Sequence, residues 1–157
     1  MILNSKILGA DEKKIIILHG FLGSLDNWVT FAKKLSNNGY EVHLIDQRNH
    51  GKSFHSDDFN YELMANDLYK YLYEKNINKT SILGHSMGGK TAMLYSLMYP
   101  DTINKLIVVD ILPVNYNTNY DEIFEALLDI DLKEIKSRND FNIHLNKHFD
   151  DPNFILF

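Results

Sequence analysis

Cysteine is absent from the 157 residues of the sequence. Without a thiol, the chain forms no disulfide bond, no thiolate metal site and no cysteine nucleophile. Positive charge is also scarce, because 16 Lys and Arg residues face 21 Asp and Glu residues, which leaves a formal net charge of −5. A chain of this charge lacks the basic patch that nucleic acid or an anionic lipid surface attracts. We therefore expect neither nucleic acid nor a membrane as a partner.

Long apolar runs are missing as well. Residues 1–9 contain a short apolar stretch that Asn4, Ser5 and Lys6 interrupt, and it is too short and too polar for a signal peptide or a membrane span. No internal repeat, low-complexity tract or linker rich in Pro, Gly and Ser divides the chain. With 45% hydrophobic and 24% charged residues, the composition is that of an average globular protein. We expect a soluble, cytoplasmic protein.

Short apolar runs rich in β-branched residues alternate with longer segments of helical periodicity over the first 110 residues. This alternation is typical of βα units around a mainly parallel sheet, so the predicted class is α/β. A helix is predicted at 61–74 behind the cap residue Asn60, with an apolar stripe that includes Leu68 and Leu72. The expected strands are residues 2–8, 15–18, 41–45, 80–83 and 105–109, the last four fully buried, and the other expected helices are 25–35 and 88–98.

The alternation stops after Asp110. Three short amphipathic helices without a strand between them are predicted at 120–128, 132–136 and 141–149, and they indicate an inserted helical cap. We therefore divide the chain into an α/β core at 1–112 and a cap segment at 113–157. The last seven residues end in the apolar run 154–157 and carry no helix stop or polar tail, so the chain is expected to be an N-terminal fragment.

A serine occupies the centre of the pattern G-x-S-x-G at residues 84–88, between a predicted strand and a predicted helix. In such a turn the serine backbone is strained, its hydroxyl stands above the sheet, and glycine is needed on both sides because a Cβ atom would clash. This context predicts Ser86 as a nucleophile. The expected oxyanion donors are the backbone N–H of Met87, at the helix N-terminus, and that of Phe21, in the loop after an earlier strand.

The same residues also satisfy a phosphate-binding pattern. Residues 84–91 read G-x-x-x-x-G-K-T, and residues 106–110 form an apolar run that ends in Asp. A P-loop normally follows the first strand of its core, however, whereas this one follows several. A nucleotide-binding interpretation also leaves the segments HGFLG and DQRNHG without a role. We favour the serine hydrolase and keep a P-loop NTPase as the alternative.

Five segments occur in a fixed order: HGFLGS at 19–24, DNW at 26–28, DQRNHGKS at 46–53, GHSMGG at 84–89 and VVDILPV at 108–114. In these segments the chain resembles the α/β-hydrolase superfamily and, within it, the small serine esterases of the YbfF and ABHD type. The resemblance implies cleavage of a small-molecule ester or thioester through an acyl-enzyme, without a cofactor. It covers roughly the first three-fifths of such an enzyme of about 250 residues.

The resemblance also implies a Ser-Asp-His triad. Asp110 takes the place of the acid, although an Asp at a strand end also serves to cap a turn, and a later Asp could fill the role. The triad histidine comes last in chain order, after a final strand that this sequence lacks, so weak or no esterase activity is expected. His144 and His148 stand at i and i+4, and we favour solvated cap residues over a base or a metal pair. No metal site is expected, because no third ligand stands at a usable spacing.

Aromatic residues are candidates for the substrate pocket. Trp28, Tyr116 and Phe124 are expected to line it, although core packing is the default role of such side chains. The sequence leaves the acyl group, the alcohol group and the oligomeric state open. Four further residues are expected to fix a loop or to pack beside the nucleophile: Asp46, Arg48, His50 and His85.

Overall fold

The structure, a computed structural model, describes residues 2–114, 121–131 and 133–148. The chain divides into two compact units, Met1–Pro113 and Val114–Phe157, and each unit is described by itself. No helix within the described ranges is both long and apolar enough to cross a lipid bilayer.

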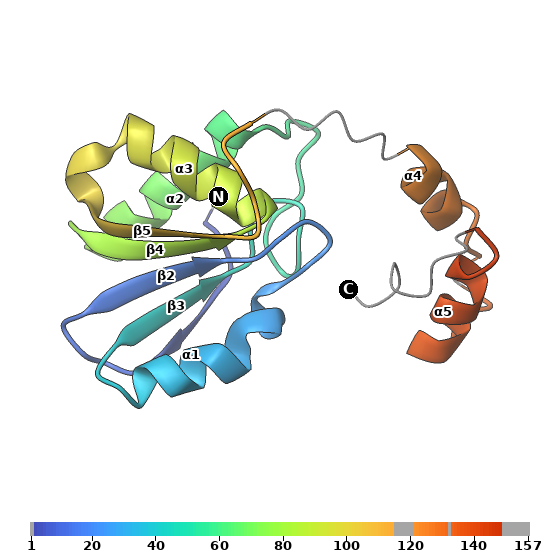
Figure 1. The fold of residues 1–157 in the computed structure, drawn as a ribbon, viewed down its shortest axis with the longest axis horizontal. Coiled ribbons are helices and arrows are strands. Elements are labelled where there is room, and N and C mark those ends of the chain that lie inside the picture. The colour runs from blue at the N-terminus through green and yellow to red at the C-terminus, as the bar shows by residue number, and fades with distance from the viewer. Residues whose placement is uncertain (1, 115–120, 132, 149–157) are drawn as a thin grey trace. The chain divides into compact units, whose positions relative to one another are not determined.

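The first unit is built on a five-stranded sheet with the strand order β1-β3-β2-β4-β5 (Figure 1). Strand β1 pairs with β3 in antiparallel orientation, and all the other pairs are parallel. The predicted α/β class and its mainly parallel sheet are therefore confirmed. The strands are β1 (Ser5–Leu8), β2 (Lys14–Leu18), β3 (Glu41–Ile45), β4 (Thr80–His85) and β5 (Ile103–Val109).

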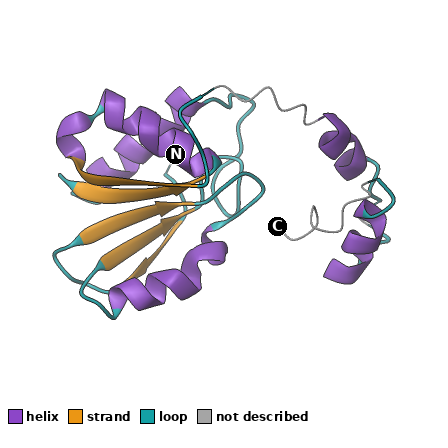
Figure 2. Cartoon of the chain, viewed as in Figure 1, coloured by secondary structure: helices purple, strands orange, loops and turns teal. Residues whose placement is uncertain are grey.

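Helices cover both faces of this sheet (Figure 2). One face carries the 3₁₀ turn η1 (Leu25–Trp28) and α1 (Val29–Ser36), which together replace the single helix predicted at 25–35. The other face carries α2 (Tyr61–Glu74) and α3 (Met87–Met98), and the short turn η2 (Pro100–Thr102) leads from α3 into β5. The predicted cap of α2 is present, because the Asn60 side chain accepts a hydrogen bond of 2.8 Å from the Leu63 N–H.

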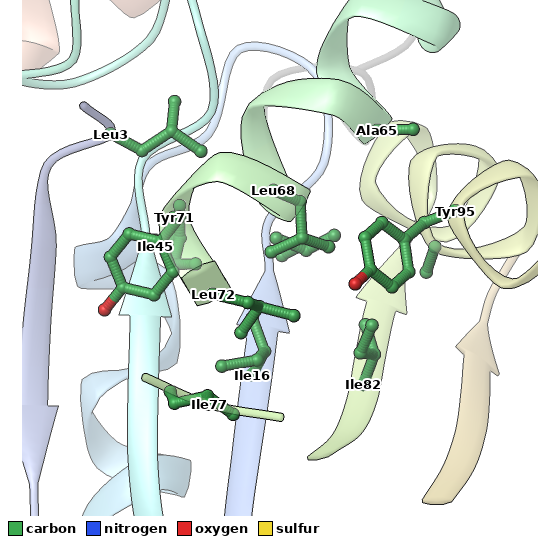
Figure 3. Packing of buried hydrophobic residues seen from close by; sticks show 12 residues of the cluster. Leu3, Ile16, Ile45, Ala65, Leu68, Tyr71, Leu72, Ile77, Ile82 and Tyr95 are labelled. Atoms are coloured by element: carbon green, nitrogen blue, oxygen red, sulfur yellow. The ribbon is translucent and has the colours of Figure 1, made fainter. Parts of the chain in front are cut away.

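Two apolar layers result from the alternation of side chains along β2. Ile16 and Leu18 point into the layer shared with α2 and α3, whereas Ile15 and Ile17 point into the layer shared with α1. Figure 3 shows the first layer, in which Leu68 and Leu72 of α2 lie over the strands. Because both faces of β2 are buried, the strand reads as an uninterrupted apolar run.

Strand β5 differs from the expectation of full burial. Its residues 104–107 are exposed, with Leu106 at 36% and Ile107 at 41% of full exposure. Within the described part of the chain β5 pairs only with β4, so it forms an edge of the sheet. The prediction was wrong at this strand because an apolar run does not reveal whether a neighbour lies on both sides.

The second unit contains α4 (Asp121–Leu128) and α5 (Arg138–Leu145). The helix predicted at 132–136 is wrong for the described residues 133–136, which form a turn and an irregular segment. The Asp131 carboxylate accepts a hydrogen bond of 2.9 Å from the Lys133 N–H and closes this turn. Residue 132 and the predicted helix ends at 120 and 149 lie outside the described residues.

Candidate active site

Ser86 is the single residue between the end of β4 at His85 and the start of α3 at Met87. Its backbone angles of φ 49° and ψ −115° lie in a sparsely populated region, which costs about 1–3 kcal/mol for a residue with a Cβ atom. Two hydrogen bonds hold it there: the Ser86 N–H donates to the Val109 carbonyl at 3.0 Å, and the Ser86 carbonyl accepts from the Lys90 N–H at 3.1 Å. The surrounding structure thus imposes the strained turn.

Glycines allow α3 to begin directly on the ends of two strands. A Cβ atom at Gly88 would lie 2.5 Å from the carbonyl oxygen of Leu18, at the end of β2. A Cβ atom at Gly84 would overlap the carbonyl of Gly88 in the first turn of α3. The glycine requirement predicted from the pattern therefore has a steric origin at both positions.

The loop after β2 lies against the nucleophile turn. A Cβ atom at Gly20 would lie 3.3 Å from the Ser86 Cβ and 2.9 Å from the His85 Nδ1. Phe21 follows in a turn that the Gly23 N–H closes on the Gly20 carbonyl at 3.1 Å. Met87 is the first residue of α3, so its N–H has no partner within the helix. Met87 thus follows Ser86 directly, and Phe21 follows Gly20, the residue that lies against the nucleophile turn.

His19 is a buried structural residue. Its Nδ1 lies 2.7 Å from the Gly20 carbonyl, which only accepts, and its Nε2 lies 3.1 Å from the Gln47 N–H, which only donates. These partners fix the tautomer with the proton on Nδ1. Burial lowers the pKa of His19 below its usual value, so the ring is neutral near pH 7. Both ring nitrogens are occupied, and His19 is not available as a base for Ser86.

Asp46 connects three segments around the site. Its carboxylate accepts hydrogen bonds from the N–H of Leu25 at 2.8 Å, the N–H of Lys52 at 2.9 Å and the side-chain amide of Asn4 at 2.8 Å. Burial alone would raise the pKa of Asp46, but these hydrogen bonds more than offset it, and the pKa lies below its usual value. Asn4 also donates its backbone N–H to the Ser53 hydroxyl at 2.8 Å and accepts from the Asp46 N–H at 3.0 Å. No sequence pattern pointed to Asn4.

Arg48 and His50 complete this loop. The Arg48 Nε donates to the Asp67 carboxylate of α2 at 2.6 Å, and both residues are buried. The His50 Nδ1 donates to the Arg48 carbonyl at 2.9 Å, and its ring centroid lies 6.0 Å from that of Phe21. The contacts of this loop are thus internal to the fold, and they brace the segment that carries Phe21.

Asp110 lies beside the nucleophile turn. It follows β5 with a positive φ of 54°, and its side chain is 85% exposed. Its Oδ2 lies 3.8 Å from the His85 Nε2, which is beyond hydrogen-bond length. The predicted nucleophile follows β4 and the predicted acid follows β5. Because these neighbouring strands are parallel, both residues lie at the carboxyl ends of the strands.

The predicted pocket residues fall in different places. Trp28 packs against the core layer of α1, and its ring centroid lies 6.0 Å from that of His85, so it stands next to the nucleophile turn. Phe124 belongs to α4 in the second unit and is exposed there. Tyr116 lies outside the described residues. Only Trp28 is therefore placed near Ser86 within one unit.

The phosphate-binding alternative does not fit this turn. A P-loop wraps several backbone N–H groups around a phosphate, whereas here His85 still belongs to β4 and Met87 already belongs to α3. The Thr91 hydroxyl, which would bind Mg²⁺ in a P-loop, is buried and donates to the Met87 carbonyl at 3.2 Å. The geometry favours the serine turn over a nucleotide site.

Comparison with known proteins places the chain in a family. Residues 13–153 match the family described as the alpha/beta hydrolase fold. The chain is 36% identical over 148 residues to esterase YbfF of Escherichia coli, which covers 94% of this chain and 58% of that protein. It is 46% identical over 101 residues to the sn-1-specific diacylglycerol lipase ABHD11 of Mus musculus, which covers 64% of this chain and 33% of that protein.

A solved structure gives the same result. The chain is similar to a marine microorganism esterase with a TM-score of 0.90 and 41% identity, over 99% of this chain and 61% of that one. The chain thus spans less than two thirds of the length of each of these relatives. On the matched family and on the strained serine turn between β4 and α3, the chain belongs to the α/β-hydrolase family.

Proposed function

We propose that the protein is a serine hydrolase that cleaves a carboxylic ester through an acyl-enzyme, with Ser86 as the nucleophile. The observation that carries the proposal is the backbone of Ser86, which is held at φ 49° and ψ −115° between β4 and α3. Such strain persists only where the surroundings impose it, and it lifts the serine hydroxyl above the ends of the strands. The named relatives, an esterase and a lipase, support the same class of reaction.

The proposed reaction begins with attack of the Ser86 Oγ on the carbonyl carbon of the ester, while a histidine takes the hydroxyl proton. The N–H groups of Met87 and Phe21 would donate hydrogen bonds to the oxyanion. The alcohol then leaves with the proton, and water releases the acyl group from Ser86 by the same route in reverse. Asp110 would orient the histidine and stabilise its protonated form.

We infer that the proton acceptor is not among the histidines of the first unit, because in this fold the base comes after the nucleophile and the acid in chain order. His19 and His43 are bonded through both ring nitrogens, and His50 donates to a carbonyl. His85 faces Asp110 from the residue just before the nucleophile. We expect the base from the part of the longer relatives that this chain does not match, so the chain alone should turn over a short acyl ester far more slowly than they do.

Labelling with a fluorophosphonate probe tests the nucleophile without requiring turnover. We expect slow modification of the wild-type chain at Ser86, located by peptide mass spectrometry, and none in Ser86→Ala. Ser96→Ala is the matched control, since Ser96 lies in the same helix α3 and donates only to the Met93 carbonyl. Equal labelling of Ser86→Ala, or no labelling of the wild-type chain after prolonged exposure, would contradict the proposal.

A further inference from the structure

Three side chains of the second unit that the proposed function does not use converge on one point. The Nε2 atoms of His144 and His148 lie 3.7 Å and 3.4 Å from the same carboxylate oxygen, Oδ2 of Asp129. The three ligand-type atoms all lie within 4.8 Å of one another. The sequence predicts no metal site here, because no third ligand stands at a usable spacing from the histidine pair. Asp129, which fourteen intervening residues separate from His144, comes close to the pair in the folded chain.

The backbone explains how these residues meet. The Asp129 N–H donates to the Glu125 carbonyl at 3.0 Å, which extends α4 by one residue. Beyond α5, the His148 N–H donates to the Leu145 carbonyl at 2.9 Å, so the chain turns once more and keeps His148 on the same side as His144. The ring centroids of the two histidines lie 5.4 Å apart. The cluster thus joins the ends of the two neighbouring helices labelled in Figure 1.

Hydrogen bonding within the cluster does not account for this arrangement. Separations of 3.4 Å and 3.7 Å exceed the usual length of an N–H···O bond, and both imidazoles face one oxygen atom. The His144 Nε2 is buried and has no hydrogen-bond partner in the structure. A buried nitrogen without a partner is unfavourable, so a ligand at this position would stabilise the arrangement.

We propose that Asp129, His144 and His148 form a binding site for a divalent transition-metal ion, with Zn²⁺ as the ligand that suits them best. Zn²⁺ binds imidazole nitrogen and carboxylate oxygen at about 2.0–2.2 Å, which places tetrahedral ligand atoms about 3.4 Å apart. The two Nε2–Oδ2 separations of 3.4 Å and 3.7 Å are close to this value, and all three ligand atoms lie within 4.8 Å of one another. Water would take the fourth position, because Asp129 is exposed on its outer side.

The chemistry of the donor set argues against other common ions. Mg²⁺ and Ca²⁺ prefer oxygen ligands, and two of the three donors here are imidazoles. The ion would link the end of α4 to the end of α5, so binding should stabilise the second unit against unfolding. This role needs no participation of Ser86.

Calorimetric titration of the 157-residue chain with zinc chloride tests the site. We expect one Zn²⁺ per chain, no binding of Mg²⁺ at the same concentration, and at least a tenfold loss of Zn²⁺ affinity in each of His144→Ala, His148→Ala and Asp129→Asn. His55→Ala and Glu134→Gln are the matched controls, because these residues are exposed and lie outside the cluster. Both controls should bind Zn²⁺ as the wild-type chain does.

A second measurement separates loss of the site from loss of the fold. Far-UV circular dichroism should show unchanged helix content in the three cluster variants without metal, and Zn²⁺ should raise the unfolding temperature of the wild-type chain but not of these variants. Wild-type affinity in His144→Ala or His148→Ala would overturn the proposal. Equal binding of Mg²⁺, or a loss of Zn²⁺ binding in His55→Ala of the same size, would overturn it as well.

Discussion

Gly88 is the residue through which α3 contacts the end of β2. A methyl group in Gly88→Ala would meet backbone carbonyl oxygens of Leu18 and His19 at 2.5 Å and 2.6 Å, and backbone cannot move aside as a flexible side chain can. We expect Gly88→Ala to lower the free energy of unfolding by about 3 kcal/mol, measured by urea denaturation with the fluorescence of the single Trp28. Displacement of α3 should also abolish phosphonate labelling of Ser86.

Gly39→Ala is the comparison for this prediction. Gly39 has a φ of +81°, and its nearest neighbour to an added Cβ atom is the Asp11 carboxylate at 4.0 Å. The substitution therefore adds backbone strain of about 1 kcal/mol without a steric clash. Labelling of Ser86 should persist in Gly39→Ala. A loss of stability in Gly88→Ala no greater than in Gly39→Ala would contradict the steric explanation.

Site residues could be predicted from the sequence where their contacts are local, and not where the contacts join distant segments. Ser86 and its two glycines lie within five consecutive residues, so their spacing alone indicates a strand-to-helix turn. The hydrogen bonds between Asn4 and Asp46 join segments 42 residues apart, and nothing near Asn4 in the sequence indicates them. Contacts that depend on the register of separate strands are visible only once the fold is known.

Strand β5 is the element whose exposure differs most from the prediction, because it was expected to be fully buried. Leu106 and Ile107 are exposed on a strand that pairs with β4 alone in the described part of the chain, and such an edge offers unpaired backbone groups to another chain. We expect the isolated chain to associate as its concentration rises. A lysine in Ile107→Lys should shift it towards the monomer, measured by size-exclusion chromatography with light scattering.

Leu97→Lys is the control for this experiment. Leu97 of α3 is 78% exposed, so its replacement removes an exposed apolar side chain of similar size away from the sheet edge. If association proceeds through β5, Leu97→Lys should leave the mass distribution unchanged. An equal shift in both variants would indicate general hydrophobic association and would contradict pairing at the edge.

The elements were predictable to different degrees. Helix α2 has the bounds expected from the sequence, because Asn60 marks its start and its apolar stripe keeps one periodicity. Strand β1 was expected, but its antiparallel pairing with β3 follows from chain topology and not from its own residues. The segment 133–136 carries residues that suit a helix, yet the turn closed by Asp131 prevents one. The periodicity of the sequence thus predicted where helices and strands lie more reliably than it predicted which elements they pair with or pack against.

Two buried histidines make the stability of the whole molecule depend on pH. Burial lowers the pKa of His19 and of His43, whose Nε2 donates to Glu41 while its Nδ1 accepts from the Tyr71 hydroxyl. Their folded-state pKa values lie below the unfolded value of about 6.5. The stability they contribute is therefore complete above about pH 6.5 and is lost as the pH falls through the folded-state values.

We accordingly expect the free energy of unfolding to fall as the pH is lowered from 7.5 to 5, by up to about 1.4 kcal/mol per pH unit for each of the two histidines. Urea denaturation at several pH values measures this slope. His43→Gln removes one of the two groups, so it should reduce this slope by up to about 1.4 kcal/mol per pH unit. It should also lower the free energy of unfolding at pH 7.5. An unchanged slope in His43→Gln, or a stability that rises towards pH 5, would contradict the assignment.

Asn4 has a practical consequence for handling the protein. Through Asp46, this residue is connected to Leu25, behind the loop of Phe21, and to Lys52 in the neighbouring loop, while Leu3 beside it is buried. A purification tag fused directly before residue 2 would therefore be attached two residues from a side chain that is hydrogen-bonded to Asp46. A flexible spacer between the tag and Ile2 should be part of any expression vector used to measure activity.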